Sequence, residues 1–162
     1  MDEQIKVRLY GLMEDPVSKA PVMVLKPEVE DRLFPIWIGL HEANAISMEL
    51  EKISSPRPMT HDLISEIIYC FDGSVDKVVI SDMKETTFFA KLYLKKDDEI
   101  KIVDCRPSDA IALALKYNSN IYIDRTVYQT YTLSDQNTGF LNNEFVYENW
   151  SFNVNKEILD IL

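Results

Sequence analysis

The order of the hydrophobic patterns along this chain limits its fold more than any other feature of the sequence. Short apolar or alternating segments, each the length of a β-strand, follow one another across turn residues, and helical patterns come after groups of three. The expected strands are residues 5–9, 21–25, 33–38, 75–81, 88–94, 100–104 and 121–123, and the expected helices are residues 41–53, 60–71 and 107–116. Strands joined by short turns, with helices gathered beside them, predict an α+β domain with a largely antiparallel or mixed sheet packed against helices.

An internal repeat is visible when the sequence is shifted by 67 residues. Residues 42–46 then lie over residues 109–113, and the apolar segment 33–38 lies over the segment 100–105. Self-similarity at a fixed offset indicates a duplicated supersecondary unit. We therefore expect two strand-strand-strand-helix units, with Glu42 and Asp109 at equivalent helix starts.

The charge balance limits what the chain can bind. Its 162 residues include 17 Lys and Arg against 27 Asp and Glu, which gives a net charge of −10. A chain this acidic does not hold nucleic acid by general phosphate neutralisation, so a nucleic-acid role needs a local basic patch or a bridging cation.

The sequence also gives an expectation for the cellular compartment. No apolar run approaches the roughly 20 residues of a membrane span, and the acidic amino end leads straight into a strand pattern. The two cysteines, Cys70 and Cys105, lie in apolar surroundings without a Cys-x-x-Cys pattern. We expect a cytoplasmic protein with no membrane contact, in which both cysteines are buried free thiols.

The composition changes near residue 126. Residues 126–162 contain one lysine against five acidic residues, together with many asparagines and aromatic rings. A polar segment with that many rings is seldom a free tail. We therefore divide the chain into a domain at 1–125 and an acidic, aromatic-rich C-terminal extension at 126–162. We expect the extension to be irregular and docked on its own domain or on a partner subunit.

Three polar clusters lie beside the predicted helix starts, at residues 39–42, 56–62 and 104–109. Arg57 and Arg106 each precede a proline, which restricts their backbone to extended conformations. Helix N-termini present free N–H groups and a positive dipole end, and arginine adds a bidentate fork for phosphate. These arrangements predict that Arg57 and Arg106 bind phosphate.

The same clusters contain groups suited to hydrolysis. His61 can move protons near neutral pH. The carboxylates of Asp62, Asp104, Asp109 and Glu42 could hold a magnesium ion through oxygen ligands. Together these side chains predict metal-assisted cleavage of a phosphodiester.

A structural interpretation of the clusters stays open beside the catalytic one. Asp62, Asp109 and Glu42 fall in first helical turns, where carboxylates cap amides and complement the helix dipole. Thr60 and Ser108 are ordinary cap residues, and the two arginines can pair with the carboxylates. A capping role does not call for a histidine, so His61 is the member that this interpretation explains least.

A weaker pattern lies on the expected strand at 88–94. Phe89, Lys91, Tyr93 and Lys95 alternate on one strand face, with Lys96 and Lys101 near the adjoining turn. Alternating rings and lysines can stack bases and neutralise phosphates. The same alternation is also typical of the solvated face of an antiparallel sheet.

The motifs, taken in order, resemble those of the bifunctional nuclease (DNase/RNase) domain family. Residues 34–46 contain Pro-Ile-x-Ile-Gly followed by Glu-Ala, residues 57–63 match Arg-Pro-x-Thr-His-Asp-Leu, and residues 104–114 match Asp-x-Arg-Pro-Ser-Asp-Ala-Ile-Ala-Leu-Ala. Long motifs in the right order are more specific than one short pattern. The resemblance covers about residues 5–125, and Cys105 stands where the family commonly has alanine.

The resemblance implies a nuclease that acts on DNA and RNA and that assembles as a homodimer or a larger homo-oligomer. Within it, we assign His61, Asp62, Asp104, Asp109 and Glu42 as candidate catalytic residues, and Arg57 and Arg106 as phosphate-binding residues. We expect Mg²⁺ or Mn²⁺ as the cofactor, with no ligand set assigned, and DNA or RNA as the substrate. The alternative is a non-catalytic oligomeric binding or regulatory module, in which the polar motifs are structural caps and salt bridges.

Overall fold

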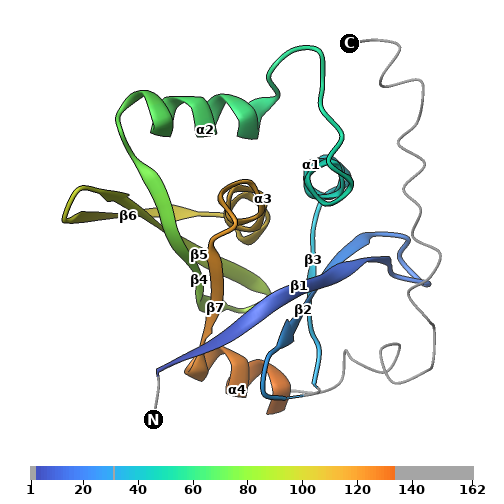
Figure 1. Cartoon of the computed structure of the whole chain (residues 1–162). Helices are drawn as coiled ribbons and strands as arrows, with labels where there is room; N and C mark the ends of the chain where they lie inside the picture. Colours follow the sequence, from blue (N-terminus) through green and yellow to red (C-terminus); the bar gives the residue numbers. More distant parts are fainter. Residues whose placement is uncertain (1–2, 31, 134–162) are drawn as a thin grey trace.

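A seven-stranded mixed sheet forms the body of the molecule (Figure 1). The structure is a computed structural model that describes residues 3–30 and 32–133. The strands lie in the spatial order β3-β2-β1-β7-β4-β5-β6. Their bounds are β1 Gln4–Glu14, β2 Pro21–Pro27, β3 Phe34–Trp37, β4 Ser74–Lys84, β5 Thr87–Lys96, β6 Glu99–Cys105 and β7 Asn120–Asp124. Every predicted strand is therefore present, and most of them extend beyond the predicted ends.

The sheet has a core face and an outer face. Alternating residues of the strands point to opposite sides, and register pairs such as Val78 with Leu92 and with Ile121 share the core face. The strand β1 is longer than the expected strand at 5–9, because Gly11 lies at a register shift inside the strand and does not end it. A bulge of this kind bends a strand without ending its pairing.

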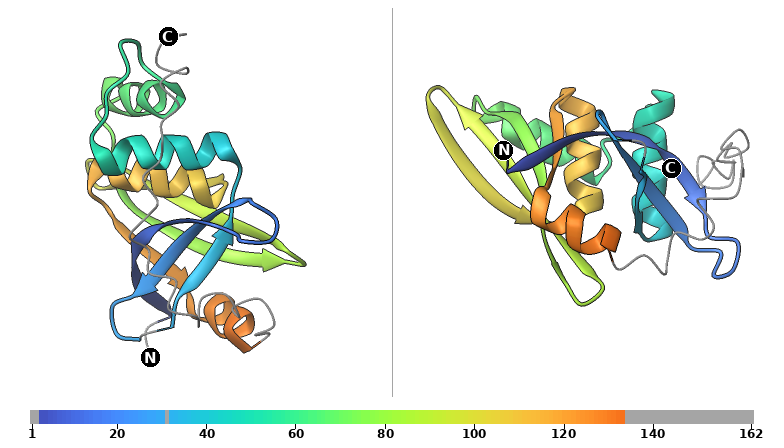
Figure 2. Two further views of the ribbon diagram at one scale, coloured as in Figure 1. Left: turned by 90° about the vertical axis from the view of Figure 1, so that its right-hand side faces the viewer. Right: turned by 90° about the horizontal axis from the view of Figure 1, so that it is seen from below.

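Within the described residues, four helices accompany the sheet. Their bounds are α1 Leu40–Glu51, α2 Thr60–Cys70, α3 Pro107–Tyr117 and α4 Arg125–Leu133. Helices α1 and α3 pack side by side on the core face, and α2 lies beyond them as an outer layer (Figures 1 and 2). Among the described residues, no helix has both the length and the apolar character that crossing a membrane requires.

The two halves of the sheet repeat the same order of elements. Strands β1, β2 and β3 form an antiparallel meander that leads to α1, and β4, β5 and β6 form a second meander that leads to α3. Strand β7 lies between the halves, antiparallel to β1 and parallel to β4. The mixed α+β sheet packed against helices is thus confirmed.

The helix starts repeat as closely as the strands do. The N-cap residues Gly39 and Arg106 have φ, ψ angles of −77°, 163° and −74°, 149°. Glu42 and Asp109 are each the third residue of their helix, and both helices end in a left-handed residue, Lys52 and Asn118. Glu42 and Asp109 therefore occupy equivalent places in the two halves.

Three local expectations differ from the structure. Helix α2 is capped at Met59, and Thr60, which we expected as the cap, is its first helical residue. Residues 125–133 form α4, so the irregular structure expected from residue 126 is wrong for this part, and residues 134–162 lie outside the described residues. Cys70 is exposed, because α2 packs through Ile68 and leaves its end in solvent, and Cys105 at the end of β6 is only half-buried.

An aromatic cluster joins the end of the core to α4. The Phe34 side chain is fully buried, and its ring centroid lies 5.4 Å from that of Phe88, 5.9 Å from that of Tyr128 and 4.7 Å from that of Tyr131. Edge-to-face and offset ring pairs at such distances add to the stabilisation from burial. The cluster therefore fastens α4 to strands of both halves.

We expect Phe34→Ala to lower the free energy of unfolding by about 3–5 kcal/mol, because it opens a cavity among these rings. Urea unfolding followed by circular dichroism measures the change. Val29→Ala, at a residue with 85% relative exposure, serves as the control and should stay within about 0.5 kcal/mol of the parent. A loss below about 1 kcal/mol for Phe34→Ala would contradict the account of this cluster.

Candidate functional site

The helix starts meet at an open cleft of about 1180 Å³. Its walls are α1, the loop 52–59, the first turn of α2 and one face of α3. The charged and imidazole side chains that line it include Glu42, Glu49, His61, Asp62, Arg106, Asp109 and Lys116. The fold therefore brings together five of the seven residues that the sequence singled out.

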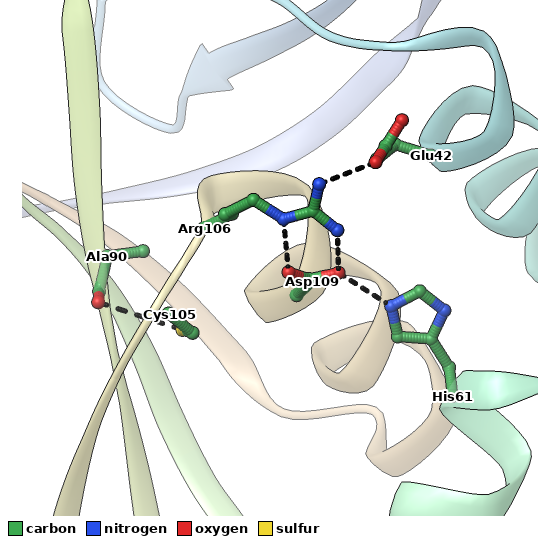
Figure 3. Close-up of polar contacts among 6 residues, drawn as sticks. All are labelled: Glu42, His61, Ala90, Cys105, Arg106 and Asp109. Atoms are coloured by element: carbon green, nitrogen blue, oxygen red, sulfur yellow. Dashed lines mark hydrogen bonds and ion pairs between the residues drawn. The ribbon is translucent and has the colours of Figure 1, made fainter.

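Arg106 is the centre of this group (Figure 3). Its Nε donates to Asp109 Oδ2 at 2.7 Å and its Nη2 donates to Asp109 Oδ1 at 3.1 Å, a bidentate pair within one helix start. Its Nη1 donates to Glu42 Oε1 at 2.6 Å, across to the other half of the chain. A guanidinium has five N–H donors, so two remain after these bonds, on a side chain with 64% relative exposure.

His61 approaches the same carboxylate from α2. Its Nε2 lies 3.0 Å from Asp109 Oδ1, and the imidazole has 14% relative exposure. A carboxylate can only accept, so the neutral ring carries its proton on Nε2 and leaves Nδ1 as an acceptor. Asp109 thereby fixes both the orientation and the tautomer of His61.

The carboxylates stay ionised because of these contacts. Burial raises the pKa of Asp109, but hydrogen bonds from Arg106 and His61 outweigh it, so the pKa lies below its ordinary value. The backbone N–H of Glu42 lowers the pKa of its own carboxyl, and Arg106 lowers it further against the effect of burial. The hydrogen bonds to Asp109 and to Glu42 raise the pKa of the Arg106 guanidinium, which stays charged.

Gly39 makes room for the Glu42 carboxylate. A Cβ atom at position 39 would collide with Glu42 Oε2, because the carboxylate folds back over the start of its own helix. The glycine thus leaves room for this orientation of the carboxylate, and its φ is not positive. The equivalent N-cap in the second half carries the Arg106 side chain instead.

A second ion-pair group borders the first. Lys116 donates to both Asp62 and Glu49, and Asp62 also accepts the backbone N–H of Met59 at 2.7 Å. Burial lowers the pKa of Lys116, but the bonds to Asp62 and Glu49 outweigh it and raise the value overall. Asp62 therefore caps α2, as the structural interpretation of the polar clusters predicts.

Sequence reasoning missed Lys116 and Glu49, although one signal was available. Lys116 and Asp109 are the only charged residues of α3, and a spacing of seven places them on one face of a helix. That face borders the cleft. A pair of charges at this spacing on an otherwise apolar helix indicates a polar face that meets other charged elements.

Two of the predicted site residues do not line the cleft. Asp104 is exposed on β6, at the register position opposite Lys91. Arg57 is exposed in the loop before α2.

Next to Arg106, the Cys105 thiol donates to the carbonyl of Ala90 at 3.6 Å (Figure 3), and burial raises its pKa to about 11, so it is not a reactive thiolate.

The arrangement of the described side chains does not match a metal centre. Within residues 3–30 and 32–133, no group of three or more His, Cys, Asp or Glu gathers closely enough to hold an ion. Arg106 lies between Glu42 and Asp109 and neutralises both, while Lys116 does the same for Asp62. The donor set is therefore occupied by the protein's own cations.

The fold and the cleft define a class of protein: a duplicated α+β domain in which a histidine, an aspartate and an arginine meet between helix starts. The chain belongs to the bifunctional nuclease domain family, because the family model for that domain matches residues 23–136.

Two kinds of relative accompany this match. An uncharacterized protein of Mycobacterium tuberculosis (strain H37Rv) is 41% identical over 122 residues, which is 75% of this chain and 73% of that protein. Bifunctional nuclease 1 of Oryza sativa subsp. indica is 29% identical over 109 residues, which is 65% of this chain and 33% of the rice protein.

We expect Asp109→Asn to lower the free energy of unfolding at neutral pH by roughly 1–3 kcal/mol, because it removes a charged acceptor of two side chains. The native pKa of Asp109 lies below the unfolded value, so its contribution is present above the unfolded pKa. It is lost as the pH falls through the native pKa. The difference between parent and variant should therefore shrink on acidification, as urea titrations from neutral to acid pH would show.

The control for this series is Asp98→Asn, which changes an exposed carboxylate in the turn between β5 and β6. Its stability should follow that of the parent at every pH. A difference between Asp109→Asn and the parent that stays constant across the acid range would contradict a role for the carboxylate charge.

Proposed function

We propose that this chain is a nuclease that hydrolyses phosphodiester bonds of DNA or RNA in the cleft. The observation that carries the proposal is the convergence of His61, Asp109 and Arg106 in one open cleft, from three separate elements. Membership in the bifunctional nuclease domain family supports it, as does the similarity to the rice protein called bifunctional nuclease 1.

In this mechanism, His61 moves the proton. Nδ1 of the neutral imidazole accepts a proton from the attacking water while the water oxygen bonds to phosphorus. Asp109 holds Nε2 and stabilises the imidazolium that forms, as a carboxylate does in other histidine-based sites. The bond from phosphorus to the leaving sugar oxygen then breaks. Solvent protonates that oxygen, and the imidazolium returns its proton to solvent.

Arg106 holds the phosphate in place. Its three bonds to Asp109 and Glu42 fix the guanidinium plane, and its two remaining N–H groups are directed away from those carboxylates. Planar N–H donors match two phosphate oxygens, and their positive charge stabilises the negative charge that builds up during attack. Because the guanidinium is already positioned, little ordering is needed when substrate arrives.

We propose separately that cleavage requires Mg²⁺ or Mn²⁺. A divalent ion supplies charge neutralisation and water activation where it binds. The steps above use only residues of this chain, and the carboxylates are already paired with Arg106 and Lys116. Comparison of activity in a chelator with activity in added Mg²⁺ or Mn²⁺ decides between the two routes.

A second candidate function is a non-catalytic binding module. The observation in its favour is that three of the cleft carboxylates already have a structural partner: Glu42 and Asp109 bind Arg106, and Asp62 binds Lys116 and caps α2. Caps and ion pairs hold a fold together without any catalysis. His61 distinguishes the nuclease from the binding module, because Nδ1 of its ring has no capping role.

We expect His61→Ala to reduce hydrolysis of single-stranded DNA or RNA by roughly 100-fold or more, because it removes the general base. His41→Ala is the matched control, since His41 also borders the cleft but has no part in the mechanism. Gel assays with each metal and with chelator measure the rates, and circular dichroism confirms that both variants fold. If the parent shows no cleavage above a mock preparation, or if both variants cleave alike, the binding module replaces the nuclease.

We also propose that the chain assembles with a second copy of itself. Helix α2 leaves Leu63, Ile67 and Phe71 exposed on one stripe, with exposed fractions of 55%, 49% and 71%. Apolar surface of this extent on a small domain is typical of an interface.

Light scattering at micromolar concentration should therefore give a mass of at least twice the 18.8 kDa of one chain. Replacing both Leu63 and Ile67 by Glu should yield monomers, because it places charge in the buried centre of the interface. Val17→Glu, at an exposed residue of the turn after β1, should leave the mass unchanged. A parent that scatters as a single chain would refute the assembly.

A further inference from the structure

The outer face of the second half of the sheet gathers lysines and aromatic rings. The register pairs Lys77 with Tyr93 and Val79 with both Lys91 and Tyr122, so these side chains lie on the face opposite the core residues Val78 and Leu92. Lys95 follows on the same side of β5, two residues beyond Tyr93. We call Lys77, Lys91, Tyr93, Lys95 and Tyr122 the outer-face cluster.

Lys77 is held in place by rings and not by a carboxylate. Its Nζ lies 4.9 Å from the ring centroid of Tyr93 and 5.4 Å from that of Tyr122, and it donates to Gln4 Oε1 at 3.1 Å. Cation–π contacts of this length fix an ammonium without neutralising its charge. One bond to Gln4 leaves two N–H donors for a ligand.

The three lysines of the cluster keep their positive charge available. In the part of the chain that the structure describes, none of them has a carboxylate within salt-bridge distance, and Asp104, the register partner of Lys91, forms no ion pair with it. Two other lysines of the sheet, Lys84 and Lys6, are paired with Asp82 and Glu28 respectively. In a chain of net charge −10, three uncompensated cations on one face form a local basic patch.

The outer-face cluster lies beside β6, the strand that leads to Arg106 in the cleft. Lys91 lies opposite Asp104, and Arg106 follows Asp104 by two residues at the start of α3. Successive outward residues of β5 are about 6.7 Å apart, so Lys95, Tyr93 and Lys91 form a row of alternating charge and ring that ends beside the strand leading to Arg106.

We propose that the outer-face cluster binds single-stranded nucleic acid and guides it to the cleft. The lysines contact phosphates, and the edges of the half-buried tyrosines offer apolar surface to unpaired bases. A duplex hides its bases from such a face, so a single strand is the favoured ligand. The inference rests on the proposed nuclease function for its purpose, but the binding can be measured without cleavage.

The test is fluorescence anisotropy with a fluorescein-labelled strand of about 15 thymidines, a length that covers one such face. The full chain is titrated in chelator, and a gel confirms that the probe stays intact. The double variant Lys91→Glu, Lys95→Glu should bind at least about tenfold more weakly. Its plot of log affinity against log salt should be shallower by about 1.4, which is two phosphate contacts at about 0.7 each.

The matched control is the double variant Lys19→Glu, Lys101→Glu, which makes the same change in net charge. Lys19 lies in the turn after β1, and Lys101 faces the other side of the same hairpin, because it pairs with the inward residue Leu94. The control should stay within about threefold of the parent, since distant exposed charges are screened by salt. Tyr93→Leu should weaken binding roughly tenfold with an unchanged salt slope.

Three outcomes would overturn the inference: no binding by the parent, equal losses in the two double variants, or a matched duplex that binds as tightly as the single strand. Hydrolysis of bis(p-nitrophenyl) phosphate, which is too small to reach from the cleft to the outer face, reports on the cleft alone. Outer-face variants that lose strand binding and keep this hydrolysis would support the inference. If His61→Ala loses hydrolysis but keeps strand binding, the result supports the catalytic role of His61 and leaves strand binding by the outer-face cluster intact.

Discussion

The contact between Arg106 and the two carboxylates of Glu42 and Asp109 is the interaction on which the site depends. The Asp109 carboxylate raises the pKa of Glu42 through repulsion, and both carboxylates stay ionised because the guanidinium lies between them. Without it, two negative charges would face each other at helix starts from opposite halves of the chain. The same contact orients His61, since the oxygen of Asp109 that receives Arg106 Nη2 also lies against the imidazole. A single side chain therefore joins the fold's two halves and sets the geometry of the candidate base.

Rigidity around this contact differs from one element to another. Helix α3 is buried along nearly its whole length, and it carries Asp109 and Lys116 on a fixed axis. Helix α2 packs chiefly through Ile68, and it supplies His61 to the cleft from its first turn. Asp109, which orients the imidazole, thus lies on the most buried helix, while His61 lies on the outer helix α2. That division suits a site in which the charge must be fixed and the proton carrier must admit a substrate.

The sequence was sufficient for the described strands, for α1, α2 and α3 and for their order, because periodicity reports burial residue by residue, but it did not predict α4. The meanders, α1 and α3, and the equivalence of Glu42 and Asp109 could all be predicted from it. The placement of Asp104 and Arg57 could not be predicted. Each is the first residue of its motif, and the direction of its side chain depends on where β6 or the loop before α2 ends. The exposure of Leu63 and Ile67 was also out of reach, since an apolar helical face looks the same whether it meets the domain or is left uncovered. Lys116 was missed because its partners, Glu49 and Asp62, come from two other helices and only the fold unites them.

The duplication of the strand-strand-strand-helix unit has a consequence for how such a site can arise. In an assembly of two identical half-sized chains, the residue at the N-cap would have to be the same on both sides of the symmetry axis. Two glycines would leave the facing carboxylates without a cation, and two arginines would crowd the space that Glu42 needs. Once both halves lie in one chain, the equivalent positions are free to diverge, and here they have become Gly39 and Arg106. Covalent fusion thus turns a symmetric meeting of two helix starts into a single asymmetric site with one donor and two acceptors.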